Sequence, residues 1–419
     1  MIIVADLLCK SISHEKVNSG FLHALHLAFP GEKIRFYAEK GHIDAIKNIL
    51  THDEVLINDL EYRSINVFFK PLALILLLEK TLRCGVDKVF LLSFSASILL
   101  SIKVLKKINP YSGLKFNFVL HSNFETIAKD SNTCRMDLPL STLPVSAKKN
   151  LAKKLRKVGL KNLPKIVFRK VTQITFDALA PRNDGFLSVK NLMSIWHADD
   201  YRYIALSPHV PSNAKKYLDT EAIKIFSVVL PTNFVKAKPF SKNSYVKFAT
   251  FGFGDSLVMY NVANMLSQRR ISRPYEIRII GMDGRGTESF PNVTAISDGR
   301  QLERHHMEFL AEDIDAFLIL YDKSRYRLTC SGSILESLSL VKPVIHFDND
   351  CINYFNKEAL PIGYKCNNLV EYIDKLVDII ENYDSYHNQF ESFRRNIEIL
   401  RKECSASAYA PQLRVSFSW

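Results

Sequence analysis

The sequence predicts an α/β protein with two Rossmann-like domains that face a central cleft. Three observations support this prediction. The chain has 419 residues, which suits two or three domains. Short apolar strands alternate with helices in both halves, as parallel βαβ units do. A passage rich in Pro, Lys and Ser at 226–244 separates the halves. We therefore expect domains at 1–228 and 229–419, with the final helices packing back on the N-terminal domain.

The N-terminal half alternates regularly as far as residue 122. Its expected strands are 1–8, 33–39, 88–94 and 115–122, and its expected helices are 20–29, 42–50, 71–83 and 97–108. The apolar segment 65–69 precedes the third helix, and 202–218 predicts a strand that runs into a helix through two prolines. Ligands of such sheets bind beyond the carboxyl ends of the strands, so the loops there are candidate sites.

The alternation restarts after the linker. Its expected strands are 246–252, 275–281, 313–320 and 343–347, and its expected helices begin near 256 or span 334–341, 369–383 and 386–403. Two such domains facing each other would place a ligand in the cleft between them.

Composition narrows the protein class. The seven cysteines form no C-x-x-C pair and are odd in number, which excludes a disulfide framework or zinc pattern and suits a reducing cytosol. The N-terminus MIIVADLL lacks a basic region and predicts a strand rather than a signal peptide. The apolar run 71–78 is too short to span a bilayer. We expect a cytoplasmic protein.

Much of the net charge of +13 lies in residues 148–170, which hold ten Lys or Arg and no acidic residue. Leu151, Leu155 and Val158 follow helical spacing, which favours an amphipathic helix on an anionic membrane surface. A solvated charged face is the alternative. We expect no nucleic-acid partner, because the cluster lacks the interleaved aromatic residues of a base-stacking surface.

The stretch RLTCSGSILESLSLVKPVIHFDND (327–350) predicts a helix opened by Ser331, Gly332 and Ser333. One interpretation is a capping box, with Ser333 as the cap and Glu336 reaching back to it. The other is an anion site, because a helix amino end with small residues offers free N–H groups and a partial positive charge. Both interpretations are compatible with these residues.

Two further motifs have two interpretations each. Gly252 and Gly254 fit the start of a dinucleotide fingerprint, but Leu257 stands where its third glycine belongs. A strand-to-helix turn with a supporting role near a phosphate fits better. Residues 348–350 spell D-x-D, which could hold a metal or contact sugar hydroxyls, and we favour the sugar. His305–His306 and the segment 196–200 lack a third metal ligand.

Residues 246–385 resemble the GT-B glycosyltransferases, which use nucleotide sugars. The resemblance rests on YEIRIIG (275–281), on the passage HHMEFLAEDIDAFLILYDK (305–323) and on SGSILESLSLVKPVIHF (331–347). The N-terminal half is similar only in architecture, together with NSGFLHAL (18–25), which is placed like the first glycine-bearing loop of the family. The resemblance implies that Ser19 and Gly20 belong to this loop, on the acceptor side.

The resemblance also implies donor-binding roles. The amides of Ser331, Gly332 and Ser333 would bind the diphosphate of the nucleotide, and Glu336 would accept hydrogen bonds from the ribose hydroxyls. Gly252 and Gly254 would support the same site. Neither a metal nor another cofactor is expected.

The sequence departs from the family pattern at two points. Leu328 occupies the position of a second glutamate found in many retaining members, and residues 251–261 contain no Arg or Lys. Of Arg285, Arg325 and Arg327, we select Arg327 to neutralise the diphosphate.

Acceptor activation has a separate set of candidates. His121, at the end of a strand, is the candidate catalytic base, because its pKa lies near the operating pH; a satisfied loop histidine is the alternative. Glu125, His14 and Glu15 are weaker candidates.

We therefore expect a glycosyltransferase of hexosyltransferase type. It would move a sugar from a nucleotide sugar to a saccharide or lipid-linked acceptor in cell-surface polysaccharide biosynthesis, such as that of O-antigen, capsule or lipopolysaccharide, as a peripheral protein on the inner face of the plasma membrane. The alternatives are a nucleotide-sugar 2-epimerase of the same fold and a non-catalytic protein that binds a membrane or a polyanion. The step from fold to function follows analogy.

Overall fold

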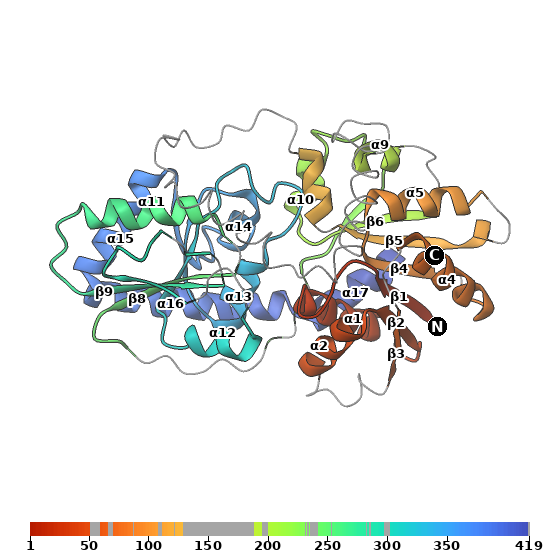
Figure 1. The fold of residues 1–419 in the computed structure, drawn as a ribbon, viewed down its shortest axis with the longest axis horizontal. Coiled ribbons are helices and arrows are strands. Elements are labelled where there is room, and N and C mark those ends of the chain that lie inside the picture. Colours follow the sequence, from red (N-terminus) through yellow and green to blue (C-terminus); the bar gives the residue numbers. More distant parts are fainter. Residues whose placement is uncertain are drawn as a thin grey trace, which may run out of the picture.

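The chain forms two α/β domains, each built on one parallel sheet, so the predicted fold class is confirmed (Figure 1). The predicted basic segment 148–170 and His121 lie outside the described residues. The computed structural model describes residues 1–50, 59–65, 70–86, 88–107, 111–120, 122–128, 188–194, 200–230, 232, 234, 242–252, 254–281, 283–284, 286–296 and 302–417.

The N-terminal sheet has the strand order β3-β2-β1-β4-β5-β6-β7, which is the Rossmann order followed by one more strand. All its neighbouring strands pair in parallel. The strands are β1 (Ile2–Asp6), β2 (Ile34–Ala38), β3 (Leu60–Ser64), β4 (Lys88–Ser93), β5 (Lys115–Leu120), β6 (Tyr201–Ala205) and β7 (Ile225–Ser227).

Helices cover both faces of this sheet because its strands are apolar on both sides. Along β1, Ile2 and Val4 pack toward α1 and α2, whereas Ile3 and Ala5 pack toward α4 and α5. The described helices of this domain are α1 (Glu15–Ala28), α2 (Lys40–Leu50), α4 (Lys70–Arg83), α5 (Ala96–Leu105), α6 (Ser122–Glu125), α9 (Val189–Ser194) and α10 (His209–Ala214).

The C-terminal sheet repeats the Rossmann order as β10-β9-β8-β11-β12-β13. Its strands are β8 (Val246–Phe251), β9 (Tyr275–Ile280), β10 (Val293–Ala295), β11 (Ala316–Ile319), β12 (Val344–Phe347) and β13 (Gly363–Cys366). Its helices are α11 (Ser256–Ser267), α12 (Arg304–Leu310), α13 (Gly332–Leu340), α14 (Asp350–Phe355), α15 (Leu369–Glu381) and α16 (Tyr383–Glu403).

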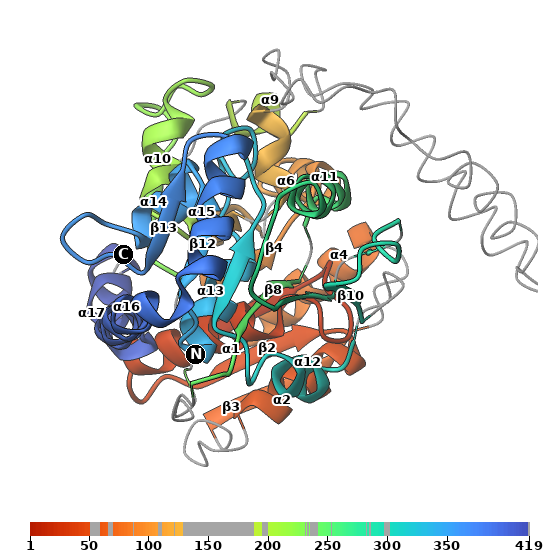
Figure 2. The same cartoon turned by 90° about the vertical axis from the view of Figure 1, so that its left-hand side faces the viewer.

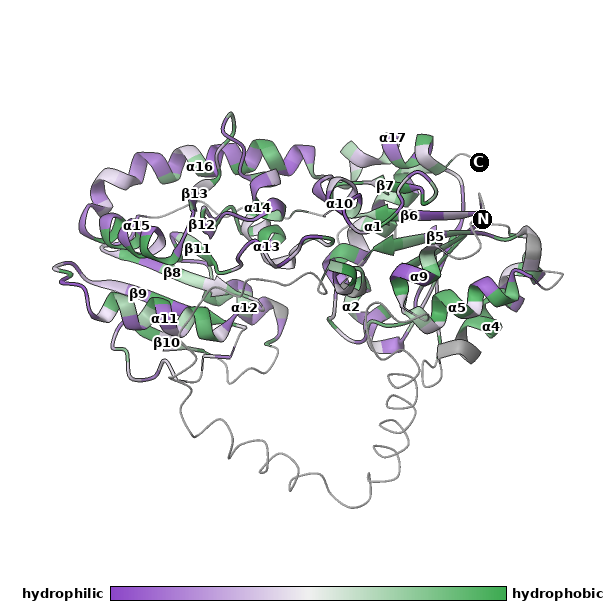
Figure 3. Ribbon diagram, turned by 90° about the horizontal axis from the view of Figure 1, so that it is seen from above, coloured by the Kyte–Doolittle hydropathy of each residue, from purple (hydrophilic) through white to green (hydrophobic). Residues whose placement is uncertain are grey.

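The last two helices connect the domains. The long helix α16 runs along the C-terminal domain and leads into α17 (Ala406–Phe417), which packs against α1 (Figures 1 and 2). Arg414 Nε donates to the carbonyl oxygen of Ala28 at 2.7 Å, and the Phe417 ring lies 5.5 Å from that of Phe90. Figure 3 shows α16 as largely hydrophilic. The buried hydrophobic residues gather around the strands of the two sheets.

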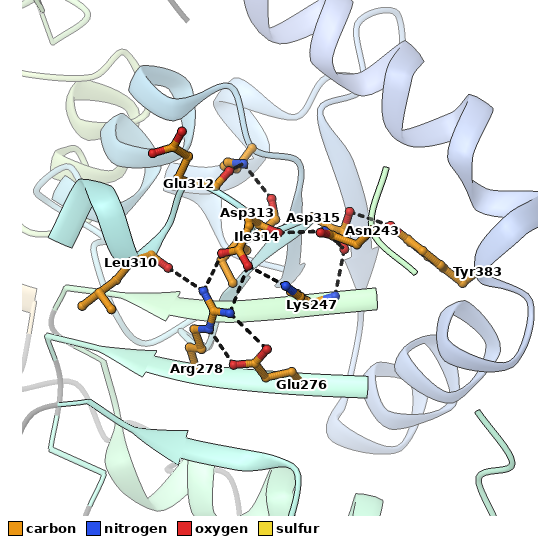
Figure 4. Close-up of polar contacts among 11 residues, drawn as sticks. Asn243, Lys247, Glu276, Arg278, Leu310, Glu312, Asp313, Ile314, Asp315 and Tyr383 are labelled. Atoms are coloured by element: carbon orange, nitrogen blue, oxygen red, sulfur yellow. Dashed lines mark hydrogen bonds and ion pairs between the residues drawn. The ribbon is translucent and has the colours of Figure 1, made fainter. Parts of the chain in front are cut away.

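A polar network closes the amino ends of the strands in the C-terminal sheet, opposite the cleft (Figure 4). Buried Asp315 accepts from the Lys247 amide at 2.8 Å and from the Tyr383 hydroxyl at 2.8 Å. Asp313 bonds to Arg278 and, at 2.6 Å, to Lys247 Nζ. The network ties the amino ends of β8, β9 and β11 together.

The structure also contains elements that the sequence prediction missed. β3, β10 and β13 were not among the predicted strands, and β7 overlaps the start of the predicted linker 226–244. β3 has only one buried residue, Leu60, so it carries no apolar run that could reveal it. Within the described residues, no helix is both long and apolar enough to span a membrane.

Candidate active site

A cavity of about 1280 Å³, counted with its open mouth, lies between the two domains. It is formed where the carboxyl ends of the two sheets face each other, which is where open α/β sheets bind ligands. The N-terminal domain contributes Ile12, His14, Glu15, Lys16, Val17, Leu206 and Leu230. The C-terminal domain contributes Phe251, Gly252, Gly281, Leu302, Met307, Tyr326, Thr329, Cys330, Gly332, Ser333, Leu335 and Glu336.

Two glycines keep the C-terminal wall of the cavity free of side chains. Gly252 follows β8 with φ 78°, and Gly281 follows β9 with φ 84°, both in the left-handed region that favours glycine. A Cβ on Gly281 would lie 3.3 Å from Gly252 Cα, and one on Gly252 would lie 3.4 Å from Ser333 Oγ. The loops after β8 and β9 therefore approach each other and the first turn of α13 closely.

Helix α13 begins in this wall. Its N-cap is Ser331, whose hydroxyl accepts from the Ser333 amide at 3.2 Å. The predicted capping box is therefore wrong: the helix starts two residues before the expected position, so Glu336 lies in the second turn, too far along to reach back to the cap. A Cβ built on Gly332 meets no atom within 4 Å. The amino end of α13 is thus open to the cavity and suits an anion.

The Ser333 hydroxyl links α13 to the ends of two neighbouring strands in this wall. It donates to the carbonyl oxygen of Phe251 at 2.8 Å and lies 2.7 Å from the Tyr321 hydroxyl. The amide of Ser331 donates to Cys351 Sγ at 3.3 Å. These bonds join the ends of β8 and β11 to α13 and orient the helix amino end toward the cavity.

Lys16 and Glu336 form an ion pair across the cavity. Lys16 Nζ lies 2.8 Å from Glu336 Oε2 and 3.8 Å from Glu308 Oε1. The side chains of Lys16 and Glu336 are only 14% and 12% exposed. The sequence predicts a role for Glu336 but none for Lys16, because no local spacing pairs residues so far apart in the chain.

The loop after β1 forms the facing wall, and Asp6 anchors it. The Asp6 carboxylate accepts from the amides of Leu8 and Cys9 at 2.9 and 2.8 Å, and also from the Ser93 hydroxyl. Burial alone would raise the pKa of Asp6, but these hydrogen bonds and the nearby His42 lower it to about 2. The carboxylate is thus a permanent acceptor for the loop.

His42 and Asn18 complete this anchor. Asn18 Nδ2 lies 2.7 Å from Asp6 Oδ2 and 2.8 Å from His42 Nε2, and His42 Nδ1 lies 2.8 Å from the carbonyl oxygen of Ser11. The Nδ1 distance fits a ring N–H that donates to the carbonyl oxygen of Ser11, while the Asn18 amide lies beside Nε2. The network therefore fixes Ser11, which has a left-handed backbone with φ 49°.

His14 stands at the end of the anchored loop and lines the cavity. It precedes α1 with φ 59°, an uncommon conformation for a residue other than glycine. Burial lowers the pKa of His14 below its ordinary value of 6.5, with the Asp6 charge opposing this effect and His42 adding to it. His14 is therefore neutral at pH 7 and able to accept a proton.

Solved structures share this architecture along almost the whole chain. The apo form of the lipopolysaccharide outer core galactosyltransferase WaaB is 13% identical, with a TM-score of 0.56 and full coverage of both chains. Anabaena Alr3699/HepE in complex with UDP-glucose is 10% identical, with a TM-score of 0.54 and coverage of 99% of this chain and 98% of that one. The chain has the GT-B fold.

A glycosyltransferase from Rickettsia africae is similar at the same level, with 11% identity, a TM-score of 0.54 and coverage of 99% and 97% of the two chains. No family model matches the sequence, and the comparison with curated proteins finds no match. At these identities the comparisons establish the GT-B fold alone.

In this GT-B fold, the loop before α13 is attached to the N-terminal domain. Glu125 accepts from the amides of Arg327 and Leu328 at 2.9 and 2.7 Å. The Arg327 guanidinium donates to the Tyr217 hydroxyl at 3.1 Å. Neither Arg327 nor Glu125 is among the described residues that line the cavity, and Glu125 holds this loop through its two amide contacts.

Two further side chains hold the same loop. His209 Nε2 donates to the carbonyl oxygen of Tyr326 at 2.8 Å, and Asn213 Nδ2 donates to that of Arg327 at 3.0 Å. Tyr326 has φ 56°, a strained conformation for a bulky residue. The contacts from the N-terminal domain therefore support a strained residue in the cavity wall.

Several predicted site residues lie elsewhere. The resemblance placed Ser19 and Gly20 in a loop, but both residues are buried inside α1. The Ser19 hydroxyl donates to the carbonyl oxygen of Lys16 at 3.0 Å. Gly254 is exposed beside a smaller pocket next to Ser333. His121 and Arg285 lie outside the described residues.

The D-x-D segment does not line the cavity. Asn349 caps α14 by accepting from the amides of Cys351 and Ile352. Asp348 pairs with Lys323 at 2.6 Å, and Asp350 accepts from Asn213 at 2.9 Å. The expected contact of this segment with sugar hydroxyls stays a prediction. In the described part of the chain, no group of three His, Cys, Asp or Glu residues could hold a metal ion.

Proposed function

We propose that this protein is a glycosyltransferase that moves a hexose from a nucleotide sugar to a saccharide or lipid-linked acceptor of a cell-surface polysaccharide. One observation carries the proposal. The open amino end of α13 and the Glu336 carboxylate share one wall of an interdomain cavity, and the anchored loop with His14 forms the facing wall. The fold comparisons support the same class of enzyme, since they include a lipopolysaccharide outer core galactosyltransferase and a protein in complex with UDP-glucose.

The donor would bind to the C-terminal wall. The diphosphate would lie at the amino end of α13, near Gly332, where backbone N–H groups and the helix dipole favour an anion. Glu336 would accept hydrogen bonds from the ribose diol. Gly252 and Gly281 support this placement because their bare backbones leave room for a ligand at that wall.

His14 would act as the general base. The acceptor oxygen forms a bond to the anomeric carbon, the bond from that carbon to the phosphate oxygen breaks, and the nucleoside diphosphate leaves. The acceptor proton passes to the neutral imidazole of His14. Such a single displacement inverts the anomeric configuration. Helix-end amides stabilise the charge that develops on the leaving phosphate.

The reaction would use no resident metal, because the D-x-D carboxylates already serve Lys323 and Asn213. The basic segment 148–170 would dock the protein on the anionic inner face of the plasma membrane. Co-sedimentation with vesicles that contain anionic lipid tests the membrane part; loss of binding when the ten basic residues are replaced by Gln is the expected result.

Thermal unfolding tests the donor site. A nucleoside diphosphate or nucleotide sugar that binds the folded protein raises its melting temperature. At a hundredfold excess over Kd, the ligand adds about 2.7 kcal/mol to the free energy of unfolding. We expect the shift for one nucleobase, its loss in Glu336→Ala and its retention in Glu358→Ala, an exposed control. The absence of any shift would instead favour a non-catalytic binding protein.

Product analysis tests the reaction. Incubation of the matching nucleotide sugar with saccharide acceptors should release nucleoside diphosphate only when an acceptor is present. Conversion of the sugar nucleotide without any acceptor would contradict transfer and favour a 2-epimerase.

A further inference from the structure

Among its described residues, the donor wall of the cavity contains no lysine or arginine that could pair with a diphosphate. Residues 251–261 contain no Lys or Arg. The Arg327 guanidinium donates to Tyr217 in the other domain. Arg325 is 59% exposed and lies 3.6 Å from Asp255. Among the described residues that line the cavity, Lys16 is the only lysine or arginine.

Lys16 belongs to the N-terminal domain but reaches the C-terminal one. It lies in the first turn of α1, and its ammonium contacts Glu336 at 2.8 Å. Glu336 is four residues beyond Gly332 in α13. Four helical residues span about 6 Å along the helix axis, and Lys16, Glu336 and Gly332 all line the same cavity.

Donor binding at Glu336 would change the partners of this ammonium. Under the proposed function, the ribose hydroxyls take the oxygens of Glu336 that Lys16 now occupies. The flexible four-carbon stem of a lysine then allows its point charge to move to the phosphate oxygens beside it. This exchange keeps the ammonium paired with an anion before and after binding, so no unpaired buried charge is left.

We propose that Lys16 is the cation that binds the donor diphosphate, and that donor binding transfers its ammonium from Glu336 to the phosphate oxygens. The inference rests on the proposed function and adds a specificity residue to it. As the bond to the sugar breaks, negative charge grows on the leaving phosphate, and the ammonium stabilises that charge across the cleft. The N-terminal domain thereby takes part in recognising the donor.

Titration calorimetry on the full chain tests this transfer. The probes are the nucleoside, its monophosphate and its diphosphate, with the base chosen by the thermal-unfolding panel. The proteins are the wild type, Lys16→Met, Lys16→Arg and Lys402→Met, an exposed lysine on α16 that does not line the cavity. The ratio of diphosphate to nucleoside affinity isolates the phosphate contribution from any general effect on folding.

We expect Lys16→Met to lower that ratio about tenfold or more, since a hydrogen bond to a charged group contributes about 1.5–3 kcal/mol. Nucleoside affinity should stay the same or rise, because Glu336 is released from its ion pair. Lys16→Arg and Lys402→Met should keep the ratio within a few-fold of the wild type.

The two proposals fail in different ways. An unchanged ratio in Lys16→Met would overturn the role of Lys16 and leave the donor site intact. Equal loss of nucleoside and diphosphate affinity would likewise overturn it, since that pattern indicates a structural role. A wild-type protein that binds none of the probes would overturn the proposed function, and the inference with it.

Discussion

Lys16 and Glu336 are 320 residues apart in the chain, yet their side chains meet at 2.8 Å across the interdomain cavity. Both side chains are less than 15% exposed, at 14% and 12%, so water screens this pair less than it screens a surface ion pair. The contact joins the first turn of α1 to the second turn of α13. It therefore links the two walls of the candidate site in the absence of a ligand.

This ion pair should couple the two residues energetically. We expect Lys16→Met and Glu336→Gln each to destabilise the protein, because each leaves one poorly solvated charge behind. The double variant should lose less than the sum of the two, with a coupling energy of about 0.5–3 kcal/mol. Urea unfolding of the four proteins measures this cycle. Strict additivity would contradict the contact.

His14 should affect the chemical step rather than donor binding. We expect His14→Ala to lower kcat by about 10²–10⁴-fold while the melting shift with the donor nucleotide is retained. His305→Ala is the control, because that side chain is 82% exposed. A normal rate in His14→Ala would rule out the base role.

The pH profile gives a second check on His14. The base acts when neutral, and burial holds its pKa below the ordinary 6.5. The kcat/KM of the wild type should therefore stay high as the pH falls through 6.5 and decline only below that value. The residual activity of His14→Ala should not show this decline. A midpoint of kcat/KM above pH 7 would point to another group.

Gly252 and Gly332 offer a matched pair of substitutions. Gly252→Ala should destabilise the protein by about 1–2 kcal/mol, because φ 78° is left-handed. Gly332→Ala should leave stability unchanged or raised, since its Cβ meets no atom within 4 Å and alanine favours a helix. The added methyl group at Gly332 should still weaken diphosphate binding. Melting temperatures with and without nucleotide distinguish the two effects; a destabilised Gly332→Ala would contradict the open helix end.

Glu125 should hold the loop before α13 on the N-terminal domain. Its two oxygens accept from the amides of Arg327 and Leu328, so Glu125→Ala removes both acceptors at once. We expect faster amide hydrogen exchange in a peptide that spans 326–331, and an intermediate rate in Glu125→Gln, which keeps one acceptor oxygen. Exchange as slow as in the wild type would show that the remaining contacts suffice.

Asp313 should make stability depend on acidic pH. Burial raises its pKa, but hydrogen bonds from Arg278 and Lys247 outweigh this and lower it to about 2 from 3.8. A carboxyl with a depressed pKa in the folded state stabilises the fold above pH 3.8, and this contribution is lost as the pH falls through about 2. Unfolding free energies measured from pH 5 to 2 should fall less steeply for Asp313→Asn than for the wild type. Asp44→Asn, at an exposed position, should follow the wild type.

Local patterns predicted the sheets well where the strands are apolar. The strands at 2–6, 34–38 and 246–251 match the predicted segments closely, because their side chains are buried on both faces. β3 (Leu60–Ser64) carries charged and half-exposed residues and was missed. The start of α1 was also misplaced, since His14 forms no side-chain cap that the sequence could reveal.

The sequence by itself determined the two alternating domains, the glycine turn after β8, and the small residues that open α13, since each depends on neighbours within a few positions. Only the tertiary structure decided that Lys16 meets Glu336 and that Glu125 binds the amides of Arg327 and Leu328. Both contacts join residues of the two domains. The pairing therefore depends on the geometry of the whole fold, and no local spacing in the chain encodes it.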